Sequence, residues 1–233
     1  MEKGNTVELL GWYGGDVVNA CSAWTSTSRD LTDEKKERIP SLLKMLAEKG
    51  HHTPFEKSTV HFLVDTDIAS HIHFLKHRIS SLNAESARYK ELKEDKYYLP
   101  NDWDDISANN MTEDYKYDLS FFGQNFSIWG EPWLDILEEY TKLGNELYHK
   151  CLEDLEPKLG RKRAKESARY FKTYNSKIQS DVMFNWRSFV NFQNLRNHKT
   201  AQKEIREISG QMLDLVKNIE GNPFKHTLAA FNL

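Results

Sequence analysis

The segment 131–155 constrains the fold of this chain more than any other feature of its sequence. Apolar residues recur there every three or four positions, which is the spacing of one face of an α-helix. They are Trp133, Ile136, Leu137, Tyr140, Leu143, Leu147, Cys151 and Leu155. Pro157 and Gly160 follow and are typical of a helix end. We therefore expect a helix of about 25 residues, roughly 37 Å long, whose apolar face is buried against other elements.

The rest of the chain indicates shorter helices and one clear strand. Val60, Phe62 and Val64 alternate with other residues, which predicts a strand over 58–64. Helices are expected at 32–49, 67–78, 163–174, 185–194 and 200–219, a loop or irregular strand at 79–92, and a loop-rich excursion at 91–130. Many helices and few strands indicate the α+β class, here a single domain over residues 1–233 with helices packed on a small antiparallel or mixed sheet.

Composition limits the classes of function. The chain has 233 residues and a formal net charge of −3, which argues against a generally basic nucleic-acid-binding protein. No apolar run approaches the ~18 residues of a membrane span, and the first residues lack the layout of a signal peptide. Cys21 and Cys151 lie far apart, which argues against a disulfide framework or a thiolate zinc site. We expect a cytoplasmic protein that binds neither nucleic acid nor membrane.

One short stretch concentrates groups that bind anions. Lys76-His77-Arg78 lies at the end of an expected helix, and Ser86-Ala87-Arg88-Tyr89 follows seven residues later. Arginine offers a fixed fork of donors that suits phosphates and pyrimidine edges, and a serine hydroxyl can bind the same oxyanion. The alternative is a solvated basic helix end that complements the helix dipole. Residue types alone do not decide between the two.

A second polar cluster lies on the helix expected at 185–194. Arg187, Asn191 and Asn194 share one face of it, at offsets of four and seven. Aromatic residues such as Phe189 lie between them, and buried amides are costly unless they are hydrogen-bonded. We expect amides with dedicated partners there; amide pairing inside a helical interface is the alternative.

The histidines and nucleophiles give weaker signals. His73 and His77 are four apart on an expected helix, but position 74 is Phe, where the zinc motif HExxH has Glu. No carboxylate on that face completes a ligand set. No GxSxG, dinucleotide or P-loop motif occurs, and neither cysteine lies in a polar motif. We therefore expect no metal site and no nucleophilic side chain.

Taken together, these stretches resemble the flavin-dependent thymidylate synthases. That family's signature of Arg-His-Arg, seven residues and Ser appears here as Lys76-His77-Arg78 and Ser86. Its His-x-Thr/Ser-Pro-Phe-Glu element corresponds to residues 51–56, and its asparagine–arginine block corresponds to residues 185–196. Arg169 occupies another arginine position of the family.

The resemblance implies a homotetramer of α+β subunits, with each active site built from several chains. The family makes dTMP from dUMP and uses FAD, methylenetetrahydrofolate and a reduced nicotinamide, taken here as NADPH. Its reduced flavin activates the pyrimidine, so no cysteine attacks the ring. The implied cofactor-binding residues are Ser26, Thr53, Glu56, Lys76, His77, Arg78, Asn83, Asn185, Arg187 and Asn191. The implied substrate-binding residues are His73, Lys76, Glu85, Ser86, Ala87, Arg88, Arg169 and Arg196. Arg196 is the implied catalytic residue, which contacts the uracil edge and stabilises its ionised form.

Three positions depart from the family pattern. Lys76 stands where the family has Arg, which keeps the charge but loses the fork of donors. Ala84 stands where Glu is common, and its neighbour Glu85 points elsewhere if the segment is extended. Thr200 stands where a histidine is usual. The departures leave two alternatives open: a relative that modifies another pyrimidine deoxynucleotide, and a catalytically impaired flavin- or nucleotide-binding protein.

Overall fold

The structure is a computed structural model that describes residues 4–104, 106–109 and 130–233. These residues form two compact units, each described here by itself. The sheet unit comprises residues 5–85 and 178–233, and the helical unit comprises Gly4 and residues 86–177. The α+β class expected from the sequence is confirmed. The expected single domain over 1–233 stays a prediction. None of the described helices is long and apolar enough to span a membrane.

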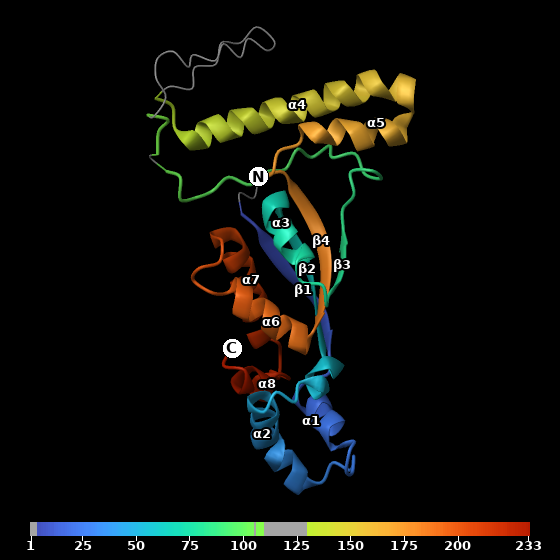
Figure 1. The fold of residues 1–233 in the computed structure, drawn as a ribbon, viewed down its shortest axis with the longest axis vertical. Coiled ribbons are helices and arrows are strands. Elements are labelled where there is room, and N and C mark those ends of the chain that lie inside the picture. Colours follow the sequence, from blue (N-terminus) through green and yellow to red (C-terminus); the bar gives the residue numbers. More distant parts are fainter. Residues whose placement is uncertain (1–3, 105, 110–129) are drawn as a thin grey trace. The chain divides into compact units, whose positions relative to one another are not determined.

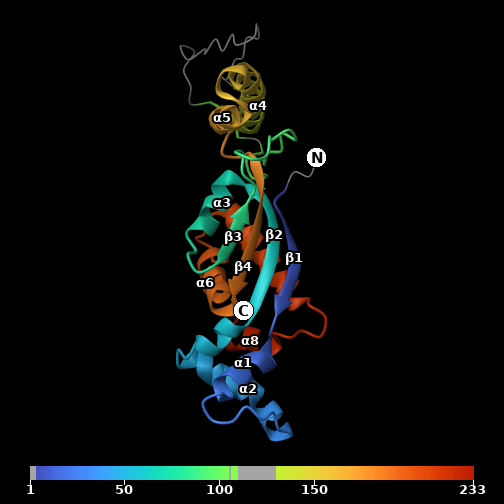
Figure 2. The ribbon, with the colours of Figure 1, turned by 90° about the vertical axis from the view of Figure 1, so that its right-hand side faces the viewer.

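Four strands form one sheet, in the order β1-β2-β4-β3 (Figure 2). They are β1 (Thr6–Tyr13), β2 (Thr59–Asp67), β3 (Ser81–Ala84) and β4 (Lys177–Asn185). Strand β1 pairs antiparallel with β2, and β3 pairs antiparallel with β4. The sequence predicts β2, over 58–64 rather than the observed Thr59–Asp67, but neither β1 nor β4. Strand β4 escapes the pattern because Ser180 is buried although it is polar; its hydroxyl lies 2.8 Å from Nδ1 of His71.

Seven helical segments complete the sheet unit. They are α1 (Asp16–Trp24), α2 (Asp33–Glu48), the 3₁₀ helix η1 (Thr53–Lys57), α3 (Ile68–Leu75), α6 (Trp186–Arg196), α7 (Lys203–Lys217) and α8 (Lys225–Ala230). Thr32, Asp67 and Asn185 cap α2, α3 and α6, each accepting a hydrogen bond from a backbone N–H three residues later. The predicted starts of these helices are thereby confirmed. Two predicted bounds are wrong: α3 ends at Leu75 rather than near Arg78, and α7 begins at Lys203 rather than near Thr200.

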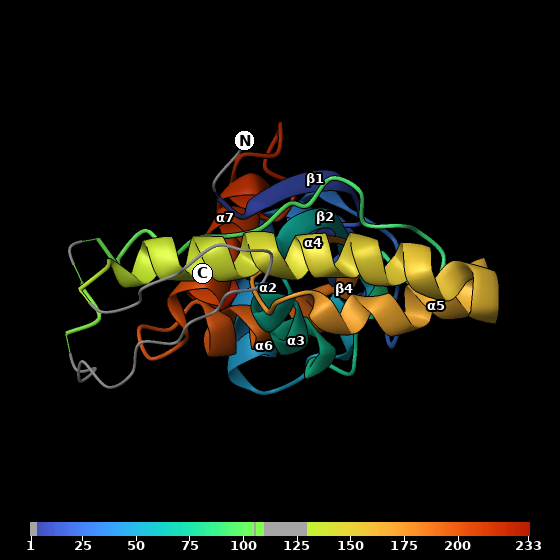
Figure 3. The same cartoon turned by 90° about the horizontal axis from the view of Figure 1, so that it is seen from above.

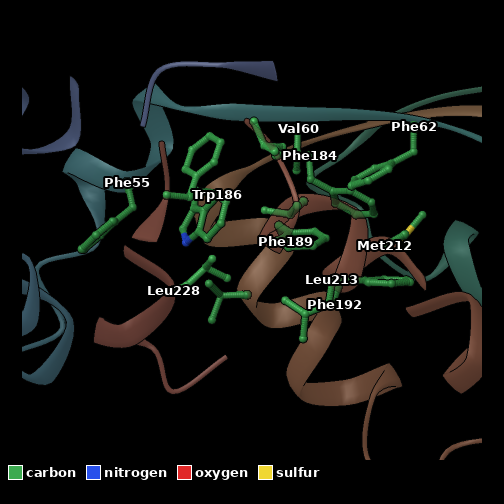
Figure 4. Close-up of a cluster of buried hydrophobic side chains, with 14 of the residues drawn as sticks. Phe55, Val60, Phe62, Phe184, Trp186, Phe189, Phe192, Met212, Leu213 and Leu228 are labelled. Carbon is green, nitrogen blue, oxygen red and sulfur yellow. The ribbon is translucent and has the colours of Figure 1, made fainter. Parts of the chain in front are cut away.

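Helices α3, α6 and α7 pack against the sheet through a core of aromatic side chains (Figures 1 and 4). Phe189 stacks on Phe62 of β2 at a centroid distance of 5.8 Å, and Phe192 stacks on Phe74 of α3 at 5.2 Å. Trp186 stacks on Phe224 at 4.4 Å. These contacts fix the rotation of α6, so that its opposite face carries the polar residues of the site.

A buried polar network joins α1 to α8. The carboxylate of Asp16 accepts hydrogen bonds from the backbone N–H and the hydroxyl of Thr227, at 2.8 and 2.6 Å. Asn19 donates to the Thr227 hydroxyl and accepts from Ser58 at the start of β2. This network holds the end of the chain beside η1, where the ring of Phe231 meets Phe55 edge-on at 4.8 Å.

The helical unit is built on α4 (Trp133–Leu159) and α5 (Arg161–Ala168), which lie side by side (Figure 3). Tyr148, Leu152, Ala164 and Ala168 form its buried core. The long helix expected from the sequence is confirmed in its extent, but Pro157 lies inside it rather than ending it. The expected burial of its apolar stripe is wrong: the buried positions are Thr141, Gly144, Asn145, Tyr148 and Leu152, and Tyr140 of the stripe is exposed. The helix expected at 163–174 is shorter; it continues only as a 3₁₀ turn, η4 (Arg169–Phe171). Of the expected 91–130 excursion, residues 105 and 110–129 lie outside the described residues.

Candidate active site

A cavity of about 520 Å³ opens in the sheet unit between η1, the end of α3 and α6. The side chains that line it are His52, Glu56, Lys76, His77, Arg78, Ile79, Arg187, Ser188, Val190, Asn191, Asn194 and Phe231. Arg187, Asn191 and Asn194 reach it together because residues four and seven apart share a helix face. The sequence predicts this grouping, and the structure confirms it.

The cavity carries an excess of positive charge. Lys76, Arg78 and Arg187 line it, against one carboxylate, Glu56. Nη1 of Arg187 lies 2.7 Å from Oε1 of Glu56, so this pair links α6 to η1 across the mouth of the cavity. Lys76 and Arg78 have no side-chain partner among the described residues. Two unpaired cations beside the cavity suit an anionic group such as a phosphate.

His77 and Arg196 form a contact at the edge of the same cavity. Nε of Arg196 donates a hydrogen bond to Nε2 of His77 at 3.0 Å. The imidazole is 9 % exposed and meets the ring of Phe192 edge-on at 4.9 Å. Burial, the guanidinium of Arg196 and the neighbouring His73 together lower the pKa of His77 to about 4. Of the three potential cations in Lys76-His77-Arg78, His77 is therefore neutral at pH 7, and its ring acts as an acceptor.

This lowered pKa predicts how stability depends on pH. An unfolded histidine has a pKa of about 6.5, so the unfolded chain takes up a proton before folded His77 does. The free energy of unfolding should therefore fall as the pH drops from ~6.5 to ~4, by at most about 3 kcal/mol from this residue. Urea unfolding at several pH values should show this slope reduced in His77→Gln and kept in the control His51→Gln, an exposed histidine. Equal slopes in the two variants would contradict the assignment.

The amides of α6 divide into two groups. Asn185 is the helix cap, and its Oδ1 accepts from the backbone N–H of Ser188 at 2.9 Å. Asn191 and Asn194 are exposed at the cavity, so the expectation of buried amides there is wrong for both. The buried amide is Gln193, which donates to the backbone oxygen of Ser209 and accepts from its hydroxyl. The reason is helical geometry, because position 193 faces α7 and positions 191 and 194 do not.

Several residues implied by the resemblance lie outside the cavity lining. Ser26 follows α1, and its hydroxyl donates to the backbone oxygen of Ala23. Thr53 begins η1 and is exposed, and Asn83 lies on β3 opposite Asp181. Nε2 of His73 lies 2.9 Å from Oε1 of Gln202.

Glu85 bends back onto the sheet. Its backbone N–H donates to the carbonyl of Gln179, and its carboxylate accepts from the backbone N–H of the same residue at 3.0 Å. This geometry agrees with the expectation that Glu85 points elsewhere and does not replace the missing carboxylate at Ala84.

The remaining implied substrate residues belong to the helical unit. Ser86, Ala87 and Arg88 share one turn, in which the hydroxyl of Ser86 accepts from the backbone N–H of Arg88 at 3.3 Å. Nε of Arg88 donates to Oε1 of Glu166 on α5 at 2.7 Å. Arg169 is exposed three residues after Glu166, at the end of the same helix.

The histidine pair expected to be poor metal ligands has other partners. His73 faces Gln202, His77 faces Arg196, and the nearby His71 is buried against Ser180. Across residues 4–104, 106–109 and 130–233, no group of three or more His, Cys, Asp or Glu is placed to hold a metal ion.

Some lining residues are absent from the set implied by the sequence. Phe231 lies in the last three residues, and no periodic pattern marks it; the α1–α8 network brings it to the cavity. His52 faces it edge-on at 5.4 Å. Asn194 can be identified from the sequence, because its offset of seven from Arg187 places both on one helix face. Val190 and Ile79 line the cavity as apolar surface, which no motif identifies.

Comparison with known proteins identifies the family. The model of the family described as "Thymidylate synthase complementing protein" matches residues 10–220. The chain belongs to this family. A flavin-dependent thymidylate synthase of Pseudothermotoga lettingae is 31 % identical over 220 residues, which cover 91 % of this chain and 85 % of that relative. A flavin-dependent thymidylate synthase of Thermosipho africanus is 30 % identical over 217 residues, covering 93 % and 87 %.

A solved structure agrees with the fold of this family member. The UMP/dUMP methylase PolB of Streptomyces cacaoi, bound with 5-Br dUMP, superposes with a TM-score of 0.73. The two chains are 24 % identical, and the match covers 99 % of this chain and 96 % of the other. The family model and the relatives confirm the family expected from the sequence and the expectation that the chain is an enzyme.

The relatives are named as flavin-dependent enzymes, and the donor set of the cavity fits a flavin. A dinucleotide flavin carries a pyrophosphate and a polar ring edge. Lys76, Arg78 and Arg187 are the cations that could hold the first, and Asn191 and Asn194 are the amides that could hold the second. The apolar surface of Phe231 and Val190 suits a planar ring.

Proposed function

We propose that this enzyme methylates dUMP to dTMP, with FAD as cofactor, methylenetetrahydrofolate as carbon donor and NADPH as reductant. The observation that carries the proposal is the cavity in which the signature residues Lys76, His77 and Arg78 meet Arg187 and Asn191 of the second motif. Two motifs more than 100 residues apart in the sequence thus build one site. Family membership and the names of the relatives support the same reaction.

In this proposal the cavity holds the flavin. Lys76, Arg78 and Arg187 neutralise its phosphates, and the amides of Asn191 and Asn194 bind its polar edges. Glu56 holds the guanidinium of Arg187 in place through the 2.7 Å ion pair. When bound, reduced flavin would supply a hydride for the activation of the pyrimidine, so that no cysteine nucleophile is required.

Arg196 is the proposed catalytic residue. Its Nε is occupied by His77, which leaves the terminal nitrogens of the guanidinium available for an oxygen of the pyrimidine. A fixed cation there stabilises negative charge that develops on the ring. His77 can hold this geometry only as a neutral acceptor, and burial and the charge of Arg196 lower its pKa to about 4.

The rest of the assignment concerns the nucleotide and the assembly. Ser86, Ala87, Arg88 and Arg169 would bind dUMP, and several copies of the chain would complete each site as a homotetramer. The cytoplasmic location expected from the sequence is part of the same proposal.

The direct test is to purify the protein, measure the FAD released on denaturation, and assay dTMP formation from dUMP with methylenetetrahydrofolate and NADPH. We expect a yellow protein that forms dTMP. The variant Arg187→Met should lower the FAD content several-fold, because it removes both a cavity cation and the partner of Glu56. The control Lys57→Met removes an exposed cation of η1 that does not line the cavity and should leave the FAD content unchanged. A colourless protein that releases no FAD would refute the proposal.

A second candidate is the methylation of another pyrimidine nucleotide. It is favoured by Ala84, which stands where Glu is common in the family. Glu85 does not replace that carboxylate, because its own carboxylate is bound to the backbone of β4. Running the same assay with UMP and dCMP in parallel would decide: faster turnover of either over dUMP would favour this candidate.

A further inference from the structure

We infer that Glu166 is a positioning residue for the nucleotide, which orients Arg88 without touching the ligand. This inference rests on the proposed function, in which Arg88 binds dUMP. The structure shows Glu166 on α5 and Arg88 in the turn that follows Ser86, within one compact unit.

The contact between the two side chains is directed at one atom. Oε1 of Glu166 accepts from Nε of Arg88 at 2.7 Å, while Oε2 lies 3.5 Å from Nη1 of Arg163. Each carboxylate oxygen is therefore fixed by a different arginine. The side chain of Glu166 is 18 % exposed and that of Arg88 is 45 % exposed. The hydrogen bond to Arg88 holds the pKa of Glu166 below its usual range, so the carboxylate is ionised at neutral pH.

Because Glu166 binds Nε of Arg88, the two terminal nitrogens of the guanidinium are available to bind a phosphate. Arginine binds phosphate with a pair of parallel N–H groups, and the two terminal nitrogens of Arg88 have no partner among the described residues. The guanidinium also lies 5.7 Å from the ring centroid of Tyr89, within the range of a cation–π contact. Glu166 thus fixes the direction in which Arg88 presents its fork of donors.

Helix α5 also holds the backbone of the same turn. Nζ of Lys165 donates to the backbone oxygen of Tyr89 at 2.7 Å, and Nη2 of Arg161 lies 2.8 Å from Oε2 of Glu91. Together with the Glu166–Arg88 bond, these contacts tie the loop to one helix at three places. A binding group that is held in place before the ligand arrives loses less conformational entropy on binding.

Whether dUMP binds more tightly or more weakly after the charge of Glu166 is removed distinguishes a positioning role from a purely electrostatic one. A carboxylate beside an anion-binding arginine repels phosphate, so a purely electrostatic role predicts tighter nucleotide binding when the charge of Glu166 is removed. Positioning predicts weaker binding, because Arg88 then samples other rotamers.

The experiment is calorimetric titration of dUMP into the FAD-loaded enzyme, with steady-state kinetics on the same preparations. For Glu166→Gln we expect the Kd and the KM for dUMP to rise about 5- to 10-fold with kcat within twofold of wild type. Glu166→Asp, which keeps the charge, should recover part of the affinity. The matched control is Glu153→Gln, which removes an exposed carboxylate of α4 that pairs with neither Arg88 nor Arg161; it should bind dUMP as wild type does.

Thermal unfolding of each variant shows whether any loss is one of folding. Unchanged or tighter dUMP binding by Glu166→Gln would overturn the inference and leave the proposed function standing. A wild-type enzyme that does not bind dUMP would overturn the proposed function, and the positioning role of Glu166 with it.

Discussion

Replacing Arg196 with alanine should lower the rate of dTMP formation about 10²–10³-fold while FAD stays bound. The magnitude is that of removing one preorganised donor that stabilises charge in the transition state. FAD should stay bound because Lys76, Arg78 and Arg187 still line the cavity. Arg196 does not line the cavity and contacts only one lining residue, His77. Single-turnover assays with dUMP, together with the FAD released on denaturation, measure the two effects separately.

A second measurement on the same variant checks the geometry rather than the chemistry. The guanidinium of Arg196 is one cause of the low pKa of His77, after burial. In Arg196→Ala that pKa should rise from about 4 while remaining below its usual value, because the ring stays buried. The shift can be followed by NMR titration of the histidine ring protons. Turnover unchanged from wild type would refute the catalytic role; an unshifted His77 would refute the contact.

Local sequence patterns predict those parts of the fold in which one element carries its own signal. The caps Thr32, Asp67 and Asn185 mark helix starts because the capping bond is made within four residues. Strand β4 cannot be predicted in this way, since the buried hydroxyl of Ser180 has its partner in His71, 2.8 Å away and more than 100 residues earlier. A strand whose buried polar residues find their partners far away in the sequence is therefore missed.

The same distinction holds for the site. The offsets of Arg187, Asn191 and Asn194 predict a shared face from helix geometry alone. The neutrality of His77 could not be predicted, because it arises from its burial against Phe192 and from the charge of Arg196 on another helix. Nor could the role of Phe231, which depends on the hydrogen bonds of Asp16 and Thr227.

Phe192→Ala should be the most destabilising substitution near the site, costing about 3–5 kcal/mol of the free energy of unfolding. Phe192 is fully buried, stacks on Phe74 at 5.2 Å and lies 5.1 Å from the ring of Phe184. Its removal leaves a cavity between α3, α6 and the sheet that rigid aromatic neighbours cannot fill. Because His77 packs on the same ring, the pKa of His77 should also rise as water reaches the imidazole.

Urea unfolding measures the first effect and NMR titration the second. The control is Leu195→Ala on the same helix, whose side chain is 55 % exposed and whose loss should change stability by less than about 1 kcal/mol. Equal stabilities of the two variants would show that Phe192 does not support the core. If Phe192→Ala is destabilised but the pKa of His77 is unchanged, Phe192 supports the core without shielding the imidazole. The low pKa of His77 would then be due to Arg196 and His73 rather than to packing on Phe192.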